Sequence, residues 1–300
     1  MMKNFQHKIA VITGAASGFG LELAKLAAQS GMKLALADVQ KDALDAAVTQ
    51  FKGQGVPVIA ACFSVANGAD YAAFANEVLD QWGAPHLVFN NAGVGSGGLI
   101  WEASQADWDW VMGVNVGGVV HGVRHFVPAM IAAAKADASY EGHVVNTASM
   151  AGLLNAPTMG VYNVSKHAVV SLSETLYQDL KLVTQQIQCS VLCPYFVPTG
   201  ISQSERNRPA DLAAAPVTRS QMIAQANSNK AVRSGKVTAA EVAQKVMDAA
   251  KTGQFYIYSH PQALGNVQTR MEDIVQARNP TDPFAARPEI GEKLKTMLTD

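Results

Sequence analysis

The sequence predicts an α/β protein built on a doubly wound parallel sheet. Short, continuously apolar runs alternate with helix-length segments along most of the chain. Continuous apolar strands are typical of a sheet that is buried on both faces. Alternation of strand and helix produces right-handed units whose strands are parallel. In such sheets ligands bind beyond the carboxyl ends of the strands, and polar residues gather at those positions here.

Seven strands are expected, at 8–12, 33–37, 56–63, 86–89, 142–147, 187–193 and 255–258. Helices are expected between them, at 18–30, 42–52, 69–81, 108–134, 160–184 and 238–252. Thr238 with Glu241 three positions later predicts a capping box at the start of the last of these helices. The order of elements is that of a Rossmann fold, with helices on both faces of the sheet.

Residues 199–237 interrupt this alternation with a polar stretch and two short helical pieces, at 210–215 and 220–232. Long irregular insertions of this kind are typically lids or binding loops. We therefore expect residues 1–260 to form a single domain with a lid at about 199–237. Residues 261–300 are expected to be a C-terminal extension with one amphipathic helix, at about 264–277, and it would cover the pocket mouth or a neighbouring subunit.

Composition excludes several classes of partner. The net charge is −1 and no basic run is present, which argues against nucleic acid. No apolar run reaches the roughly 18 residues of a membrane helix, and the N-terminus has no signal-peptide pattern, so a cytoplasmic protein is expected. Cys189 and Cys193 share a strand, roughly 13 Å apart, too far for a disulfide. They are expected to be buried thiols in a reducing compartment.

A glycine-rich turn joins the first strand to the first helix at residues 13–20. Gly14, Gly18 and Gly20 permit a tight turn and a close approach of the backbone to a pyrophosphate at the helix N-terminus. The position of this turn between a strand and a helix predicts a dinucleotide site.

Asp38 ends the second strand, where a carboxylate can accept a hydrogen bond from the ribose 2′-hydroxyl of NAD and would repel a 2′-phosphate. No cation precedes Gly18 or follows Asp38, because Ser17 and Val39 occupy those places. NAD is therefore predicted in preference to NADP.

Tyr162 and Lys166 are four positions apart in a helical run, so they lie on one face of the helix. A phenol titrates near 10 when unperturbed, and a neighbouring ammonium should lower its pKa. The pair is a candidate for proton transfer. Taken alone, this spacing is common on amphipathic helices.

Over residues 5–260 the chain resembles the short-chain dehydrogenase/reductase family in its single-domain form. The resemblance is carried by the turn at 13–20, by Asn90-Asn91-Ala92-Gly93, by Asn115 and Ser149, by the Tyr162–Lys166 pair, and by Pro194 with Thr199. It implies an NAD(H)-dependent alcohol dehydrogenase or carbonyl reductase that interconverts a secondary alcohol and a ketone or aldehyde. It also implies that no catalytic metal is needed.

Four catalytic roles follow from the resemblance. Tyr162 would be the general acid and base, and Ser149 would hydrogen-bond the same substrate oxygen. Lys166 would lower the Tyr162 pKa and bind the nicotinamide ribose, and Asn115 would hold a water that connects Lys166 to solvent. The implied cofactor residues are Gly14, Ser17, Gly18, Phe19, Gly20, Asp38, Ser64, Val65, Asn91, Ala92, Gly93, Tyr162, Lys166, Pro194, Tyr195, Val197 and Thr199.

The chain departs from the family pattern at two of these positions. Tyr195 follows Pro194 where the family usually has glycine, so a bulky ring should reshape the pocket near the nicotinamide. Ser64 stands where the family commonly has an adenine-contacting Asp, which removes one expected hydrogen bond.

The pocket is expected along 94–100, 150–159, 195–196 and the 200–235 lid, with candidate substrate contacts at Val94, Met150, Ala151, Met159, Tyr195 and Phe196. Their apolar character favours a hydrophobic or aromatic small molecule. The alternatives are an NADPH-dependent reductase and a non-catalytic dinucleotide-binding protein. The long apolar helices at 108–134 and 160–184 need a partner surface, so a homodimer or homotetramer is expected.

Two other clusters are interpreted as structural. Trp101, Trp108 and Trp110 gather with Asp107 and Asp109 at a helix start, which favours packing and helix-start acids over a substrate role. His121, His125 and His167 have no ligand partners at metal spacing and are interpreted as non-catalytic.

Overall fold

A parallel sheet forms the centre of the computed structural model, which describes residues 2–213 and 215–299. Its seven strands lie in the order β3-β2-β1-β4-β5-β6-β7, as the doubly wound prediction requires. They are β1 (Ile9–Thr13), β2 (Lys33–Asp38), β3 (Val58–Cys62), β4 (Leu87–Asn90), β5 (Gly142–Thr147), β6 (Ile187–Cys193) and β7 (Tyr256–Tyr258). The chain reverses direction across the sheet between β1 and β4, so a switch point lies at their carboxyl ends.

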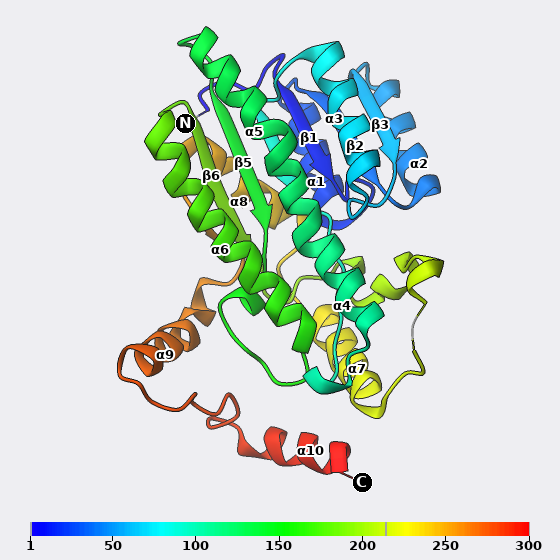
Figure 1. The fold of residues 1–300 in the computed structure, drawn as a ribbon, viewed down its shortest axis with the longest axis vertical. Helices are drawn as coiled ribbons and strands as arrows, with labels where there is room; N and C mark the ends of the chain where they lie inside the picture. Colours follow the sequence, from blue (N-terminus) through cyan, green and yellow to red (C-terminus); the bar gives the residue numbers. More distant parts are fainter. Residues whose placement is uncertain (1, 214, 300) are drawn as a thin grey trace.

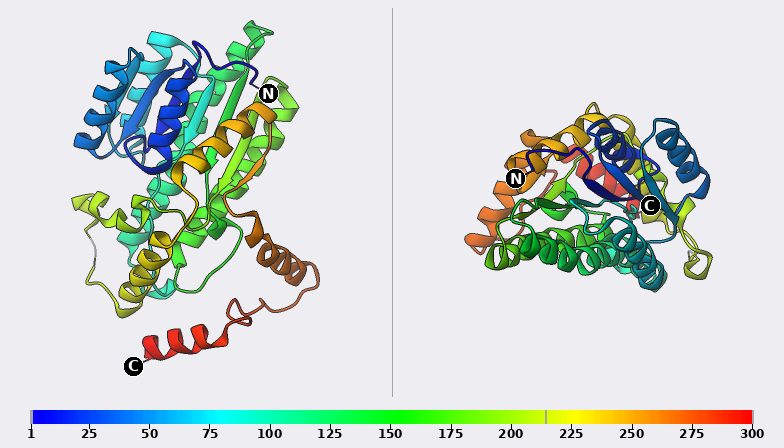
Figure 2. Two further views of the ribbon diagram at one scale, coloured as in Figure 1. Left: turned by 180° about the vertical axis from the view of Figure 1, so that it is seen from behind. Right: turned by 90° about the horizontal axis from the view of Figure 1, so that it is seen from above.

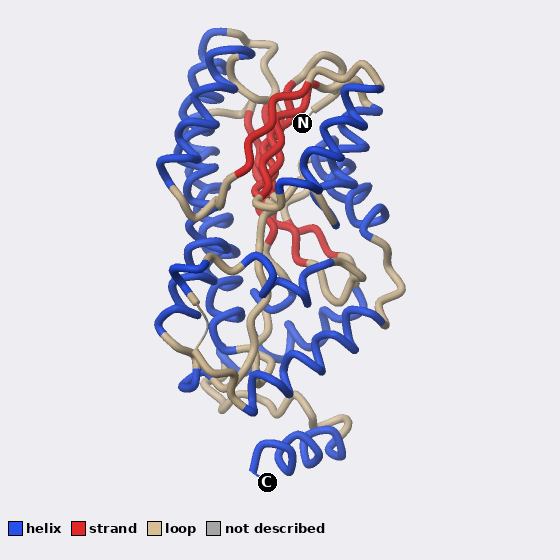
Figure 3. The backbone as a smooth tube through the Cα atoms, turned by 90° about the vertical axis from the view of Figure 1, so that its right-hand side faces the viewer, coloured by secondary structure: helices blue, strands red, loops and turns tan. Residues whose placement is uncertain are grey.

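Helices cover both faces of the sheet, which Figure 3 shows edge-on between two helical layers. One layer contains α1 (Gly18–Gln29), α2 (Lys41–Gly53) and α8 (Ala239–Thr252). The other contains α3 (Gly68–Trp82), α5 (Gly118–Ala136) and α6 (Gly160–Val183). Figures 1 and 2 show the two layers from opposite sides. The predicted helix bounds differ from these by only a few residues, except in the segment that precedes α5.

The core is split by the sheet because successive strand residues point to opposite faces. In β2, Leu34 and Leu36 belong to the α1-side cluster, whereas Ala35 and Ala37 belong to the α5-side cluster. All four are fully buried, which explains the continuous apolar character of the strand. The predicted capping box at the start of α8 is present, with Thr238 and Glu241 bonded reciprocally.

The single helix predicted at 108–134 is wrong in its continuity. The segment begins with α4 (Gln105–Met112), passes through a π-helical turn, η2 (Gly113–Gly117), and continues as α5. A single wide turn inside a long apolar segment leaves the hydrophobic periodicity almost unchanged, so the sequence pattern does not reveal it. The whole stretch Gln105–Ala136 is long and apolar enough to cross a membrane by length and composition. In this fold it packs on the sheet and α3.

The lid consists of η4 (Gly200–Asn207), η5 (Ala210–Leu212) and α7 (Arg219–Arg233). The helical piece predicted at 210–215 is only the short turn η5, and residue 214 lies outside the described residues. Thr218 and Gln221 form a capping box that starts α7.

The C-terminal extension leaves the body as an arm that Figure 1 shows below the sheet, with α10 under α7. The prediction of one helix there is wrong, since α9 (Leu264–Val275) is followed by α10 (Pro288–Thr299). Buried Asp273 fixes the connection by accepting hydrogen bonds from Thr281 N at 2.9 Å and from Arg278 Nε at 2.9 Å. The helix α10 has no buried side chain.

Candidate active site

A cavity of about 1810 Å³ extends from the carboxyl ends of the strands, under the lid, to the C-terminal arm. Residues at the carboxyl ends of four different strands line it, namely Gly14, Asp38, Asn91 and Ser149. The part bounded by these residues and by Thr199 is called the groove below. The arrangement matches the place where open α/β sheets bind ligands.

The glycine turn opens the groove. Gly14 has φ of +63° and Gly18 has φ of +52°, a left-handed conformation that favours glycine. A Cβ on Gly20 would lie only 2.0 Å from Gly14 O, so this glycine permits α1 to pack against the turn. Gly20 is the one predicted cofactor residue that does not line the cavity; the other predicted cofactor residues all do.

Asp38 is fixed at the end of β2 by backbone donors. Its Oδ2 accepts from Ala16 N at 2.9 Å and its Oδ1 accepts from Gln40 N at 2.9 Å. The side chain is buried yet lines the groove. A carboxylate oxygen has more than one acceptor position, so Asp38 can still accept a bond from a ligand hydroxyl.

The segment after β4 is tied to the glycine turn. Thr13 Oγ1 accepts from Asn91 N at 3.0 Å and from Ala92 N at 3.1 Å. The Asn91 side chain donates to Thr13 O at 3.0 Å and to Gly14 O at 3.3 Å. These bonds hold the two strand ends at a fixed separation and shape the floor of the groove.

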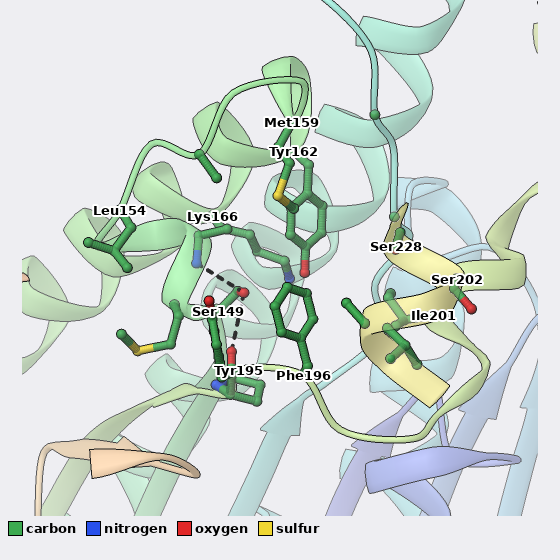
Figure 4. A pocket seen from close by; sticks show the side chains of 18 of the residues that line it. Ser149, Leu154, Met159, Tyr162, Lys166, Tyr195, Phe196, Ile201, Ser202 and Ser228 are labelled. Atoms are coloured by element: carbon green, nitrogen blue, oxygen red, sulfur yellow. Dashed lines mark hydrogen bonds between the residues drawn. The ribbon is translucent and has the colours of Figure 1, made fainter. Parts of the chain in front are cut away.

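Ser149, Tyr162 and Lys166 come together where the groove meets the lid, and Figure 4 shows their side chains around one space with Phe196 opposite. Lys166 Nζ donates to Thr147 O at 2.9 Å and lies 5.7 Å from the centre of the Tyr162 ring. Ser149 Oγ donates to Pro194 O at 3.3 Å and accepts from Ala151 N at 3.1 Å.

Burial changes the titration of both members of the Tyr162–Lys166 pair. It raises the pKa of Tyr162, while the Ser149 hydroxyl acts in the opposite direction. It lowers the pKa of Lys166 to about 8 from an ordinary value of 10.5. The sequence argument expects a lowered pKa at Tyr162, and the protein alone gives the opposite direction because desolvation of the phenolate dominates.

Asn115 lies in the π-helical turn and does not line the cavity. Its Oδ1 accepts from Val94 N at 2.8 Å, and its Nδ2 donates to Val94 O at 3.0 Å and to Ser165 Oγ at 3.0 Å. The side chain therefore fixes the strand-end segment to α6 beside Lys166. A Cβ on Gly93 would lie 3.3 Å from Asn115 Oδ1 and 3.4 Å from Lys166 Nζ, which shows how closely these groups approach.

All six predicted substrate contacts line the cavity. Leu154 and Ile201 also line the cavity and lie on opposite sides of Tyr162 and Phe196 in Figure 4. Tyr195 lies with its ring centre 4.4 Å from that of Phe196 and 5.9 Å from that of His260. Its backbone N donates to Ser259 Oγ at 2.9 Å, so residues after β6 and β7 build one aromatic wall.

The sequence did not reveal how the lid is attached. Arg208 Nη2 donates to Asp107 Oδ1 at 2.5 Å, with both side chains at most 9% exposed, and the guanidinium lies 4.3 Å from the Trp110 ring centre. Burial acts to raise the pKa of Asp107, but hydrogen bonds from Arg208 and Ser104 outweigh it and lower that pKa. The Trp–Asp cluster thus includes a helix-start acid, as interpreted, that also anchors the lid.

Two serines attach the lid to the segment after β4. Ser204 Oγ accepts from Gly95 N at 2.8 Å, and Ser220 Oγ accepts from Leu99 N at 2.8 Å.

Among the described residues there is no group of three His, Cys, Asp or Glu side chains that could hold a metal ion. Cys189 and Cys193 are buried and unpaired, as expected.

A family model and a solved structure both identify short-chain dehydrogenases as similar to this chain. The family model described as "short chain dehydrogenase" matches residues 8–210. A short chain dehydrogenase/reductase of Burkholderia phymatum, crystallised in complex with NAD, is 52% identical; the comparison covers 94% of this chain and 99% of that chain, with a TM-score of 0.90.

Two curated proteins are similar over most of their length. The "C alpha-dehydrogenase" of Sphingobium sp. (strain NBRC 103272 / SYK-6) is 31% identical over 293 residues, which are 96% of this chain and 93% of that protein. The "CLA biosynthesis dehydrogenase/reductase" of Lactiplantibacillus plantarum is 32% identical over 278 residues, which are 91% and 95% of the two chains.

Proposed function

Because this chain belongs to the short-chain dehydrogenase/reductase family and is thus an NAD(P)-dependent oxidoreductase acting on CH–OH groups, we propose that it uses NAD on a hydrophobic or aromatic secondary alcohol or its ketone. The observation that carries this proposal is the meeting of Ser149, Tyr162 and Lys166 at the inner end of the glycine-turn groove, in one continuous cavity.

The groove fits a dinucleotide. Gly14 and Gly18 leave the backbone open at the N-terminus of α1, where a pyrophosphate is favoured by free N–H groups and the helix dipole. Buried Asp38 supports NAD over NADP, because its carboxylate would repel a 2′-phosphate. The NAD complex of the Burkholderia phymatum relative supports the same choice.

The protein residues have separate tasks in the proposed mechanism. The glycine turn and Asp38 would hold the dinucleotide, which would supply or accept the hydride. Tyr162 Oη takes the proton of the alcohol or returns it to the carbonyl oxygen, and Ser149 Oγ donates a hydrogen bond to that oxygen.

Two further residues support the proton transfer. Lys166, held on Thr147 O, is placed to bind the nicotinamide ribose and to stabilise the phenolate. Asn115 positions Val94 and the turn beside Lys166, and we place there the water that links Lys166 to solvent.

The character of the cavity wall supports the substrate class. Leu154, Met159, Phe196 and Ile201 surround the space beside Tyr162 and Ser149, and Met150 also lines the cavity. A wall of this kind desolvates an apolar or aromatic group and leaves few partners for a polyhydroxylated substrate.

We also propose a cytoplasmic homodimer or homotetramer, with residues 1–260 as the catalytic domain. Exposed apolar side chains on α6, at Val164, Leu182 and Val183, support association between copies. Gel filtration at micromolar concentration should give a species larger than the 31.7 kDa chain. A monomer under those conditions would contradict this part of the proposal.

A panel of alcohols and ketones, followed by NADH and NADPH absorbance, tests the function. Hydrophobic or aromatic secondary alcohols should reduce NAD faster than NADP at equal concentration. Faster turnover with NADP would support the NADPH-dependent reductase instead. Tight NADH binding without turnover across a broad panel would support the non-catalytic alternative.

A further inference from the structure

An arginine of the lid spans the outer part of the groove. Arg206, in η4, donates from Nε to Gln40 Oε1 at 3.3 Å, although the two residues are 166 positions apart in sequence. Gln40 is the N-cap residue of α2, and its backbone N is bonded to Asp38. Both Arg206 and Gln40 line the cavity. The lid is therefore joined to the turn that follows Asp38, the predicted ribose-binding carboxylate.

The guanidinium is held in place from its own side of the groove. Arg206 Nη1 donates to Gly200 O at 3.0 Å and to Gln203 O at 2.6 Å. A Cβ on Gly200 would lie 2.8 Å from Nη2, so the group packs closely over a glycine. Among the described residues Nη2 has no hydrogen-bond acceptor, and Arg206 is exposed. Two N–H donors of a fixed guanidinium remain available to a ligand.

Charge explains which ligand group these donors suit. The pyrophosphate of a dinucleotide is anionic and would lie at the glycine turn, where a Cβ on Gly18 would be 3.5 Å from Thr199, the neighbour of the Gly200 that holds Arg206. Lys166 is bonded to Thr147 O at the opposite, inner end. The N-terminus of α1 offers partial positive charge, and Arg206 offers a full charge from the facing side. The free N–H groups of Nη2 can each donate a charge-assisted hydrogen bond to a phosphate oxygen.

We propose that Arg206 is a cofactor-binding residue of the lid, which contacts the pyrophosphate of the bound dinucleotide while its bond to Gln40 keeps the lid closed. This inference rests on the proposed function, since it requires a dinucleotide in the groove. Release of the dinucleotide then requires the Arg206–Gln40 bond to break. Arg206 thus affects cofactor affinity and residence time without touching the reacting atoms.

Binding of NADH, followed by its fluorescence, tests the proposal on the full chain. The variants are Arg206→Gln, Arg206→Lys and Gln40→Ala, with Arg219→Gln as the matched control, because Arg219 is an exposed lid arginine that does not line the cavity. Arg206→Gln should raise the NADH Kd about tenfold or more, as expected for loss of a charged hydrogen bond. Arg206→Lys should have an intermediate effect, and Gln40→Ala should mainly speed NADH dissociation in stopped-flow displacement.

Two further measurements separate a contact with pyrophosphate from a structural role. The NADH Kd of the wild type should rise more steeply with salt than that of Arg206→Gln, because a screened ion pair has been removed. Arg206→Gln should weaken competition by ADP but leave competition by adenosine unchanged. Arg219→Gln should match the wild type in every measurement.

Three outcomes would overturn the inference. One is an Arg206→Gln variant with the wild-type Kd and salt dependence. Another is equal weakening of adenosine and ADP, which would indicate a distorted groove. The last is weakening of NADPH without weakening of NADH, which would place the guanidinium on the 2′-phosphate. Failure of the wild type to bind either dinucleotide would instead overturn the proposed function.

Discussion

Lys166 is attached to the end of β5 through Thr147, whose carbonyl oxygen accepts from its ammonium at 2.9 Å. This one bond joins the helix that carries Tyr162 to the strand that leads into Ser149. The ammonium is almost completely buried there, with 3% exposure. The geometry of the three side chains therefore depends on a contact between a helix and a strand end, and not on the helix alone.

Replacement of Tyr162 and Lys166 should have different effects. Tyr162→Phe removes the proton donor and acceptor, so kcat should fall about 100- to 10,000-fold, the range for loss of a general acid or base. NADH affinity, measured by fluorescence, should stay near the wild-type value. Lys166→Met should lower both turnover and NADH affinity. Turnover of Tyr162→Phe within a few-fold of the wild type would contradict the assignment.

The burial of Lys166 should make stability depend on pH. Its pKa is about 8 in the folded protein and 10.5 ordinarily, so between these values the unfolded chain binds more protons. The free energy of unfolding of the wild type should therefore rise between pH 8 and 10.5 relative to that of Lys166→Met. The slope should be about 1.4 kcal/mol per pH unit. Urea unfolding of both proteins at pH 7.5 and at higher pH measures the difference. Parallel pH profiles would show that Lys166 titrates normally.

The Arg208–Asp107 ion pair should hold the lid on α4. Arg208→Met leaves the Asp107 carboxylate without its cation, and the lid can relieve that cost by detaching. Amide hydrogen exchange over 200–233 should become about tenfold faster or more, since each 1.4 kcal/mol is a factor of ten. Exchange in the strands should not change. Arg219→Met, at an exposed lid position, is the control; equal exchange in both variants would contradict the anchor.

The ring of Tyr195 should set the shape of the substrate pocket. Tyr195→Gly removes the contacts with Phe196 and His260 and enlarges the space next to Ser149. The ratio of kcat/KM for a bulky aromatic ketone to that for a small ketone should change by about tenfold or more. Tyr195→Phe keeps the ring and should retain the wild-type ratio. An unchanged substrate profile and cofactor affinity in Tyr195→Gly would show that the ring does not shape the pocket.

Much of the fold and of the site follows from local patterns in the sequence. Gly14, Asp38 and Ser149 each follow one strand, and a parallel sheet brings the carboxyl ends of its strands to one edge. The position of each residue relative to its own strand is therefore enough to predict that these residues lie close together. The Tyr162–Lys166 pair needs only the spacing of one helix.

The rest depends on contacts that no local pattern carries. Asp107 and Arg208 are 101 positions apart, and Arg206 and Gln40 are 166 apart. Each of these residues has a sufficient local explanation, such as a helix-start acid or a solvated lid charge. In the protein alone the pKa of Tyr162 is raised, opposite to the direction expected from its spacing to Lys166, because burial dominates the shift and burial is not visible in the sequence.

The arm formed by α9 and α10 lines the substrate side of the cavity, yet α10 has no buried side chain and α9 has only Asp273. Mutations in a segment that adds so little to the core carry little cost in folding. Tyr162 and the glycine turn, by contrast, lie on α6 and α1, which pack closely against the sheet and have no such freedom. Substitutions in α9 and α10 can therefore change the cavity lining without disturbing the packing around Ser149, Tyr162 and Lys166. Such substitutions in the arm change the lining of the cavity at little cost to the stability of the fold.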